Sequence, residues 1–275
     1  MIKRAWKARP HDLDSVMKFN PEVVEIHASS EDLDKEISGR FDVPLVVHFP
    51  EYDGENLMDA AALEELPRLK AEAFYNRALS VTRKWGQNFK GTPKAIIHPG
   101  GMSSEPRKAW ERPALYDAFK KTMDGLNQAG VDLLVENMPP QPWFYSGQWF
   151  CNIFMDPKEC LSYCTANGWS FCFDACHAKM WCNSVENMVT LEKFASIVRP
   201  VTAHLHLSDA KGVDGEGVQI GEGDIDWASL MGVLKGMNVP ASCECWQGHK
   251  DNFAGFRTFW ERLEPYLKYP ATAPS

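Results

Sequence analysis

Short apolar runs that alternate with longer helix-like stretches constrain the fold more than any other feature of this sequence. Eight such runs occur along the chain, and each is followed by a helix-like stretch or a long loop. This alternation is typical of βα units that build a parallel sheet. The predicted strands are residues 2–6, 23–27, 44–49, 95–98, 131–136, 170–174, 202–207 and 241–245.

The stretches between these strands have the composition and the end signals of helices. Asp12 is a candidate N-cap, and Gly130 and Gly168 are natural C-caps for the helices that precede them. The tail from residue 269 onward reads as frayed. The predicted helices are residues 12–19, 56–85, 113–129, 156–167, 186–197, 227–234 and 252–267.

The length agrees with one closed barrel. The chain has 275 residues, and a TIM-type barrel typically needs about 250. No glycine-rich phosphate turn follows the first strand, so the open dinucleotide-binding sheet lacks its main feature. With no internal repeat and no linker, we expect an α/β protein that forms a single (β/α)8 TIM barrel over residues 1–275.

Composition and charge exclude several other classes of protein. The net charge of −8 weighs against a dedicated nucleic-acid binder, because an acidic surface repels phosphate backbones. No run approaches the roughly 18 apolar residues of a membrane span, and no apolar segment follows the basic N-terminus as a secretory signal requires. The eight cysteines form no CxxC pair and are read as reduced, buried thiols. We therefore expect a cytoplasmic protein that is not bound to a membrane.

Nearly every predicted strand ends in an ionisable side chain. The carboxyl ends of parallel barrel strands face the same way, so these side chains should converge on the rim where barrel active sites are built. His27 is read as structural, and His206 is favoured over His204, which faces the same side of its strand. The ionisable residues at or just after these strand ends, His27 apart, are His48, His98, Glu136, Asp174, His177, His204, His206 and Glu244.

Several carboxylates at one rim predict a metal site. Glu136, Asp174 and Glu244 would repel one another strongly if they were buried together without a cation. Two or three carboxylates with an imidazole suit a divalent ion such as Mn²⁺, Mg²⁺, Co²⁺ or Zn²⁺. We therefore predict one divalent metal ion at this rim.

Five motifs, in this order and at barrel spacing, extend the interpretation. They are VENMPP at Glu136, DACH at Asp174–His177, HLHLSDAKG at 204–212, IGEGDIDW at 220–227 and ECW at Glu244. With them the chain resembles, over nearly its whole length, the xylose isomerase-like TIM barrels. That superfamily holds sugar isomerases and epimerases alongside the family 2 AP endonucleases.

The resemblance to the epimerases implies specific roles. One metal would be held by Glu136, Asp174, His206 and Glu244. Glu136 and Glu244 would also act as acid and base, moving a proton on the carbon next to a carbonyl through an enediolate. The histidine after the aspartate, which is His177 here, would contact substrate oxygens.

The resemblance to the AP endonucleases adds metals. His48 and His98 match the histidines that hold a second metal, and hydrogen bonding to substrate is an equal alternative for both. A third metal would need His177 with an Asp and a His from the loop before IGEG, where Gly215 and Gly217 fall at the expected positions near Asp214. The third site is therefore read as incomplete, which, with the acidic charge, makes nucleic acid an unlikely partner.

Loops near the rim bear on the substrate. In the segment 139–154, Trp143, Tyr145 and Trp149 could stack on a sugar face, or else cover the rim or form a subunit contact. Lys211 could meet a phosphate or carboxylate of the substrate, or be solvated. The glycine-rich segment 212–223 should form a mobile loop with Glu216 mostly in water.

These observations favour a metal-dependent sugar or sugar-acid isomerase or epimerase with a small carbohydrate substrate and a possible homo-oligomeric state. A metal-dependent phosphoesterase of the AP endonuclease kind is one alternative. A dehydratase or lyase is another, because the same proton abstraction can lead to loss of water. A barrel that binds a ligand without turnover also stays open.

Overall fold

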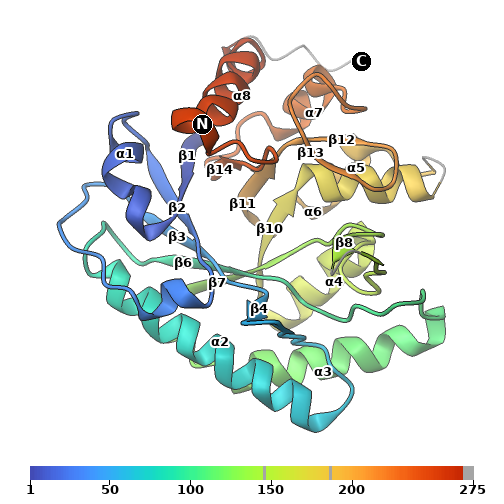
Figure 1. Ribbon diagram of the computed structural model, residues 1–275. Coiled ribbons are helices and arrows are strands. Elements are labelled where there is room, and N and C mark those ends of the chain that lie inside the picture. Colours follow the sequence, from blue (N-terminus) through green and yellow to red (C-terminus); the bar gives the residue numbers. More distant parts are fainter. Residues whose placement is uncertain (145–146, 186–187, 269–275) are drawn as a thin grey trace.

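Eight parallel strands close into a barrel in the computed structural model, which describes residues 1–144, 147–185 and 188–268 (Figure 1). Their order around the barrel is β1-β14-β11-β10-β7-β6-β3-β2, so the first and last strands lie side by side. This confirms the predicted (β/α)8 fold. The strands are β1 (Lys3–Ala8), β2 (Val23–His27), β3 (Leu45–His48), β6 (Lys94–Ile97), β7 (Asp132–Glu136), β10 (Ser170–Asp174), β11 (Thr202–Leu207) and β14 (Pro240–Cys243).

The predicted strands agree with these bounds to within two residues at each end. The first strand differs in a way that matters for the site, because it continues to Ala8 rather than ending at Trp6. Lys7 and Ala8 pair with Glu25 and Ile26 of β2, and this pairing holds them in the sheet. The side chain of Lys7 thereby joins the barrel interior.

Helices surround the barrel on its outer side (Figure 1). Within the described residues, short 3-10 helices at Pro10–Asp12, Glu31–Asp34 and Ala109–Glu111 add to the α-helices. The α-helices are α1 (Leu13–Met17), α2 (Glu65–Gly86), α3 (Arg112–Gly125), α4 (Pro157–Asn167), α5 (Ala175–Ser184), α6 (Leu191–Val198), α7 (Trp227–Leu234) and α8 (Lys250–Lys268).

The helices predicted at residues 56–85 and 113–129 are longer than the observed ones. The helix predicted from residue 56 begins at Glu65, because residues 56–57 form β5 (Asn56–Leu57), which pairs with β4 (Tyr52–Asp53). The helix predicted to end at Ala129 ends at Gly125. There Asn76 of α2 donates to the carbonyl of Gly125 at 3.1 Å and accepts from the amide of Asn127 at 2.8 Å. Gly130, with φ of 75°, therefore lies in the loop before β7 rather than capping α3.

Around α4 the sequence signals agree with the structure. Asp156 caps α4 by accepting from the amide of Lys158, and Gly168 ends it with φ of 67°. The structure adds α5 directly after β10, a helix that the sequence analysis did not assign. The helix predicted from Glu186 begins at Leu191, capped by Thr190, while Glu186 and the tail from residue 269 lie outside the described residues.

The barrel interior has an apolar layer below an ionisable layer. One cluster of buried side chains fills its lower part: Ala5, Val23, Val46, Ile96, Leu134 and Cys172. Alternate residues of a strand share a face, so the positions two residues further on also point inward. These positions carry Lys7, Glu25, His48, His98, Glu136 and Asp174. The alternation of the strands thus stacks the site on the core.

All eight cysteines are free and buried, in agreement with their interpretation as reduced thiols. Within the described residues, no helix has both the length and the apolar character needed to cross a membrane.

Candidate metal centre and active site

The structure brings together the four residues for which metal binding is predicted. Glu136 ends β7, Asp174 ends β10, His206 lies in β11 and Glu244 directly follows β14. Each offers one ligand atom, and these atoms all lie within 4.8 Å of one another. The first three side chains are buried, whereas Glu244 is partly exposed. The cluster therefore opens toward solvent on the side of Glu244.

Asp174 gives the clearest indication that the cluster fits a cation. Its Oδ1 accepts the amide of His177 at 2.6 Å, while its buried Oδ2 has no hydrogen-bond partner among the described residues. The side chain of Asn137 clamps the backbone of Asp174 on both sides, at 2.8 and 2.9 Å. Burial raises the pKa of Asp174. A buried carboxylate oxygen without a donor is costly, and a divalent cation would satisfy it.

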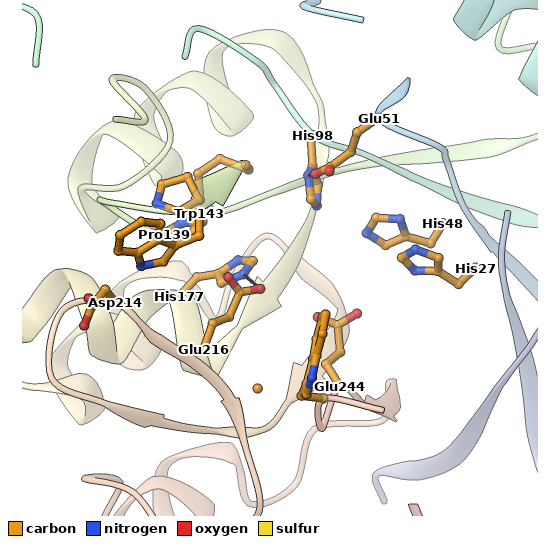
Figure 2. A pocket seen from close by; sticks show the side chains of 14 residues that line it. His27, His48, Glu51, His98, Pro139, Trp143, His177, Asp214, Glu216 and Glu244 are labelled. Carbon is orange, nitrogen blue, oxygen red and sulfur yellow. Dashed lines mark hydrogen bonds and ion pairs between the residues drawn. The ribbon is translucent and has the colours of Figure 1, made fainter. Parts of the chain in front are cut away.

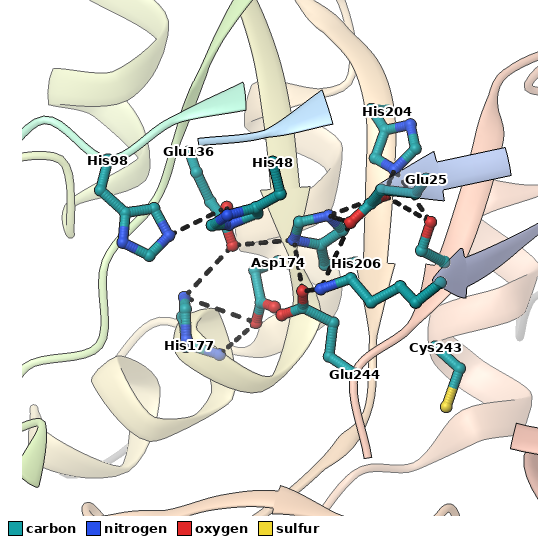
Figure 3. A network of polar contacts seen from close by, with 12 residues as sticks. Glu25, His48, His98, Glu136, Asp174, His177, His204, His206, Cys243 and Glu244 are labelled. Carbon is teal, nitrogen blue, oxygen red and sulfur yellow. Dashed lines mark hydrogen bonds and ion pairs between the residues drawn. The ribbon is translucent and has the colours of Figure 1, made fainter. Parts of the chain in front are cut away.

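Glu136 is surrounded by imidazoles (Figure 3). Its Oε1 lies 2.9 Å from Nδ1 of His206, and its Oε2 lies 3.3 Å from Nε2 of His48 and 3.2 Å from Nε2 of His98. Burial alone would raise the pKa of Glu136, but His206 and His98 hold it well below its ordinary value. Glu136 is therefore an anion in this structure and can bind a metal.

His206 contacts three carboxylates, the first of which is Glu136. Its Nδ1 also faces Oε1 of Glu244 at 3.2 Å, and its Nε2 faces Glu25 of β2 at 3.1 Å. Burial lowers the pKa of His206, but Glu136 and Glu25 outweigh it and raise the pKa to about 9. Lys7 forms ion pairs with both Glu25 and Glu244. Lys7 and His206 thus offset part of the negative charge of these carboxylates when no metal is bound.

His48 and His98 form a second group around Glu136. One ring nitrogen of His48, one ring nitrogen of His98 and one oxygen of Glu136 all lie within 4.8 Å of one another. This spacing fits a potential metal site. Burial lowers the pKa of His48 to about 4. Burial alone would also lower the pKa of His98, but Glu51 and Glu136 raise this pKa well above its ordinary value. Glu51 forms an ion pair with Nδ1 of His98 and thereby orients its ring.

The loop after β11 approaches His177. This loop is a hairpin of β12 (Asp209–Lys211) and β13 (Gly215–Val218). Glu216, expected mostly in water, is about half exposed, yet its Oε1 lies 3.2 Å from Nε2 of His177. Burial would lower the pKa of His177, but Asp174 and Glu216 raise it to about 10.

The sequence places Gly215 and Gly217 where two further metal ligands would be expected. In the structure Asp214, Glu216 and Gly217 line the cavity. Glu216 of the paired hairpin is the residue that contacts His177. Among the described residues, His177, Asp214 and Glu216 do not gather as closely as the ligand groups around Glu136.

A cavity of about 470 Å³ lies over these residues (Figure 2). His27, read as structural from the sequence, lines it and stacks on His48 with ring centres 4.8 Å apart. Trp143 of the hairpin β8 (Trp143–Phe144) and β9 (Gly147–Gln148) lines the cavity on another side and is 60% exposed. Trp246, which follows Glu244 by two residues, also lines it and is 79% exposed.

Two of the residues predicted to bind substrate do not line this cavity. Trp149 is half-buried beside the hairpin, where its amide donates to the carbonyl of Pro142 at 2.9 Å. Lys211 is exposed at the end of β12. Among the described residues, the lining includes neither of them. Tyr145 lies outside the described residues.

Sequence reasoning missed several residues that shape the site, namely Lys7, Glu25, Glu51, Glu216 and Trp246. Glu25 had a visible signal, because a carboxylate in the middle of the apolar run VVEIH needs a buried partner. Trp246 follows Glu244 within a motif that the analysis had already singled out. Lys7 was missed because the first strand was predicted to end at Trp6, two residues before its observed end.

Structural comparisons find sugar epimerases and an endonuclease. A D-tagatose 3-epimerase-like protein is 17% identical, with a TM-score of 0.69, over 97% of this chain and 100% of that chain. The 3-keto-D-glucoside 4-epimerase of E. coli is 15% identical (TM-score 0.66, 96% and 99% covered). Endonuclease IV from Thermus thermophilus is 16% identical (TM-score 0.59, 95% and 99% covered). Identities this low show a shared fold.

Sequence comparisons give the family. A search among curated proteins found no match. Residues 9–263 match the family model of the xylose isomerase-like TIM barrel. This range contains Glu25 and the proposed metal ligands Glu136, Asp174, His206 and Glu244. The chain therefore belongs to the xylose isomerase-like TIM barrel family.

Proposed function

We propose that this protein is a metal-dependent isomerase or epimerase that moves a proton next to a carbonyl group of a sugar or sugar acid. The observation that carries the proposal is the cluster of Glu136, Asp174, His206 and Glu244, whose ligand atoms all lie within 4.8 Å of one another. The cavity above the cluster, about 470 Å³, falls within the usual range of roughly 300–1,000 Å³ for small-molecule sites.

Three carboxylates and one imidazole fit Mn²⁺, Mg²⁺, Co²⁺ or Zn²⁺, and the buried Oδ2 of Asp174 needs such a partner. When bound, the metal would polarise the substrate carbonyl and stabilise the negative charge of an enediolate. A second metal at His48, His98 and Glu136 is compatible with the same chemistry.

Glu136 and Glu244 are the proposed acid and base. They come from strands that are separated in the barrel by β10 and β11. Glu244 lines the cavity, whereas Glu136 is buried and contacts His48 and His98, which line it. One carboxylate would remove the proton from the carbon next to the carbonyl, and the other would return a proton to the enediolate. His177 and Trp143, which line the cavity, would bind the substrate hydroxyl groups and one sugar face.

The names of the structural neighbours support this class of substrate, because they include 3-epimerases of ketoses and a 4-epimerase of a ketoglucoside. In each of these names, the carbon that changes configuration is bonded directly to the carbonyl carbon. We therefore propose a hydroxy-ketone sugar as the substrate.

Phosphoester hydrolysis is the second candidate, and one observation favours it. His48 and His98 share Glu136 in an arrangement that suits a second metal, and two-metal sites commonly hydrolyse phosphoesters. The lining of the cavity weighs against a polyanionic substrate, because it includes the acidic residues Glu51, Asp214, Glu216 and Glu244.

Solvent exchange in deuterium oxide would test the proposal. The metal-loaded protein is incubated with ketohexoses, ketopentoses and 3-ketoglucosides, and deuterium on carbon is measured by mass spectrometry and NMR. We expect one deuterium at the carbon that changes configuration and no loss of water. Chelation should abolish the exchange, and Glu136→Gln or Glu244→Gln at saturating metal should slow it by about 10²-fold or more.

Lys211→Ala is the matched control, because Lys211 is exposed and does not line the described cavity. It should exchange deuterium at the rate of the unaltered protein. Exchange at an undiminished rate in both glutamine variants would exclude their acid and base roles. Cleavage of abasic-site DNA, with two metals per chain, would favour the hydrolase instead.

A further inference from the structure

A second polar cluster lies inside the barrel next to the proposed metal ligands (Figure 3). Its centre is Glu25 of β2, which has no exposed surface. Ser242 of β14 donates its hydroxyl to Oε2 of Glu25 at 2.5 Å, and Nε2 of His204 lies 2.7 Å from the same oxygen. Nζ of Lys7 lies 3.3 Å from Oε1. Residues of four neighbouring strands thus meet at one carboxylate.

The same carboxylate contacts His206. Nε2 of His206 lies 3.1 and 3.2 Å from the two oxygens of Glu25. Nδ1, on the other side of the ring, lies 2.9 Å from Oε1 of Glu136 and 3.2 Å from Oε1 of Glu244. The imidazole therefore bridges two sets of carboxylates, and only the Nδ1 side belongs to the proposed metal ligands.

The chemistry of imidazole gives this arrangement a direction. A neutral imidazole has one N–H donor and one nitrogen lone pair, and the partner of the N–H decides which nitrogen keeps the lone pair. A carboxylate accepts hydrogen bonds and cannot donate them when it is ionised. An N–H on Nε2 directed at Glu25 would leave the lone pair on Nδ1, which faces the other ligands.

We propose that Glu25 is a positioning residue of the metal centre, which accepts the Nε2–H of His206 and so presents Nδ1 to the metal. Lys7, Ser242 and His204 hold the carboxylate at the correct place. This inference rests on the proposed function, because it assumes that a metal binds at Glu136, Asp174, His206 and Glu244. It adds a residue from a fifth strand, outside the four ligands.

Titration of Co²⁺ alone into the full-length, metal-free protein tests the role of Glu25. Glu25→Gln keeps the size of the side chain but removes its charge. We expect its dissociation constant for Co²⁺ to rise by about 10- to 100-fold, the usual effect of losing a partner behind a metal-bound histidine. The visible absorption bands of bound Co²⁺ should also shift, because the ring of His206 is no longer held in one orientation.

Thr122→Val is the matched control. Thr122 is buried like Glu25, but its hydroxyl donates to the carbonyl of Ala60 at 2.6 Å, outside the cluster around Glu25. The affinity of this variant for Co²⁺ should stay within about threefold of the unaltered protein, and its absorption bands should not move. Equal weakening in Thr122→Val and Glu25→Gln would mean that the metal site responds to the loss of any buried hydrogen bond, and would overturn the inference.

A second measurement needs no variant and covers the case in which Glu25→Gln fails to fold. The protein is labelled with ¹⁵N-histidine and loaded with ¹¹³Cd²⁺. We expect a one-bond coupling between ¹¹³Cd and Nδ1 of His206, and a protonated Nε2. Coupling to Nε2 would overturn the inference. If the unaltered protein binds neither Co²⁺ nor Cd²⁺, the proposed function itself fails. If it binds them and Glu25→Gln binds Co²⁺ equally well, only the role of Glu25 fails.

Discussion

Nζ of Lys7 lies 3.3 Å from Oε1 of Glu25, so an ion pair joins neighbouring strands β1 and β2 inside the barrel. Glu25 has no exposed surface, and Lys7 is 9% exposed. Burial alone would raise the pKa of Glu25, but His206 and Lys7 hold it well below its ordinary value. The carboxylate is therefore an anion, and Lys7 is the lysine that balances its charge.

Replacing Lys7 by methionine should destabilise the metal-free protein. Methionine fills a similar volume but leaves the charge of Glu25 without this partner, and breaking a buried ion pair typically costs about 3–5 kcal/mol. We expect the free energy of unfolding, measured by urea denaturation, to fall by about 3 kcal/mol. Lys7→Met combined with Glu25→Gln should recover at least about 1 kcal/mol, because residue 25 then carries no charge that needs a partner.

Lys120→Met is the control for this prediction. Lys120 forms an exposed ion pair with Asp124 at 2.6 Å on α3. Exposed pairs contribute little, so this change should alter the free energy of unfolding by less than about 0.5 kcal/mol. If Lys7→Met costs no more than Lys120→Met, the buried pair does not stabilise the barrel.

Metal affinity should rise with pH. In the metal-free structure the pKa of His206 is raised to about 9 by Glu136 and Glu25, against the effect of burial. A metal can bind the ring only after its proton leaves. Between pH 6 and 9 the association constant for Co²⁺ should increase by about tenfold per pH unit and then level off. An affinity that is constant over this range would show that His206 is already neutral.

The stability of the metal-free protein should be greatest near pH 6.5. The pKa values of His206 and His177 are raised from 6.5 to about 9 and about 10 by neighbouring carboxylates, which outweigh burial. The two protonated histidines therefore contribute fully to the stability of the folded protein below pH 6.5. This contribution is lost as the pH rises through 9 to 10. Burial lowers the pKa of His48 to about 4, so its contribution is lost as the pH falls from 6.5 to 4.

Urea denaturation at a series of pH values would measure the loss of stability at both alkaline and acid pH. His177→Gln should reduce the loss of stability at alkaline pH, since one of the raised pKa values disappears. It should leave the loss of stability at acid pH unchanged. A free energy of unfolding that does not change between pH 7 and 10 would contradict the assigned directions.

The strands and their inward positions could be predicted because a strand has a period of two residues. That period places Glu136, Asp174 and His206 on the face that also carries the apolar lower layer. Glu25 obeys the same rule, but one strand does not reveal which of its two faces points inward. Its partners lie 179 and 217 residues away in sequence, at His204 and Ser242.

Loop positions could not be predicted because contacts distant in sequence determine them. The composition of residues 56–64 favours a helix, yet Asp59 accepts amides of Ala61 at 2.9 Å and of Gly101 at 2.7 Å, which holds the segment in a loop. Glu216 reaches His177 only through the pairing of β12 with β13. Local propensity carries no information on either contact.

Trp246 should contribute to substrate binding rather than to the chemical step. It lines the cavity and is 79% exposed, so its ring is available to a sugar face. Aromatic contacts are worth about 0.5–1.5 kcal/mol, so Trp246→Ala should raise KM by about 2- to 10-fold with little change in kcat. Trp110→Ala is the control, because Trp110 is 77% exposed and does not line the described cavity. Equal KM values for both variants would exclude this role for Trp246.

Asp209 should hold the loop that carries Glu216. This buried carboxylate accepts the amides of Gly221 at 2.9 Å and Ile225 at 3.0 Å, and the indole N–H of Trp227 at 2.9 Å. Asp209→Ala leaves these donors unpaired, and hydrogen bonds to a charged group are worth about 1.5–3 kcal/mol each. We expect faster hydrogen exchange at Gly221 and Ile225.

Asp226→Ala separates this effect from a general loss of stability. Asp226 lies near the same loop but caps only α7, where it accepts the amide of Ser229 at 3.1 Å. Losing an N-cap should cost about 1 kcal/mol and leave exchange at Gly221 unchanged. Because Glu216 is carried on the segment that Asp209 holds, Asp209→Ala should also raise KM, whereas Asp226→Ala should not. Equal exchange rates at Gly221 in the two variants would show that Asp209 does not organise the loop.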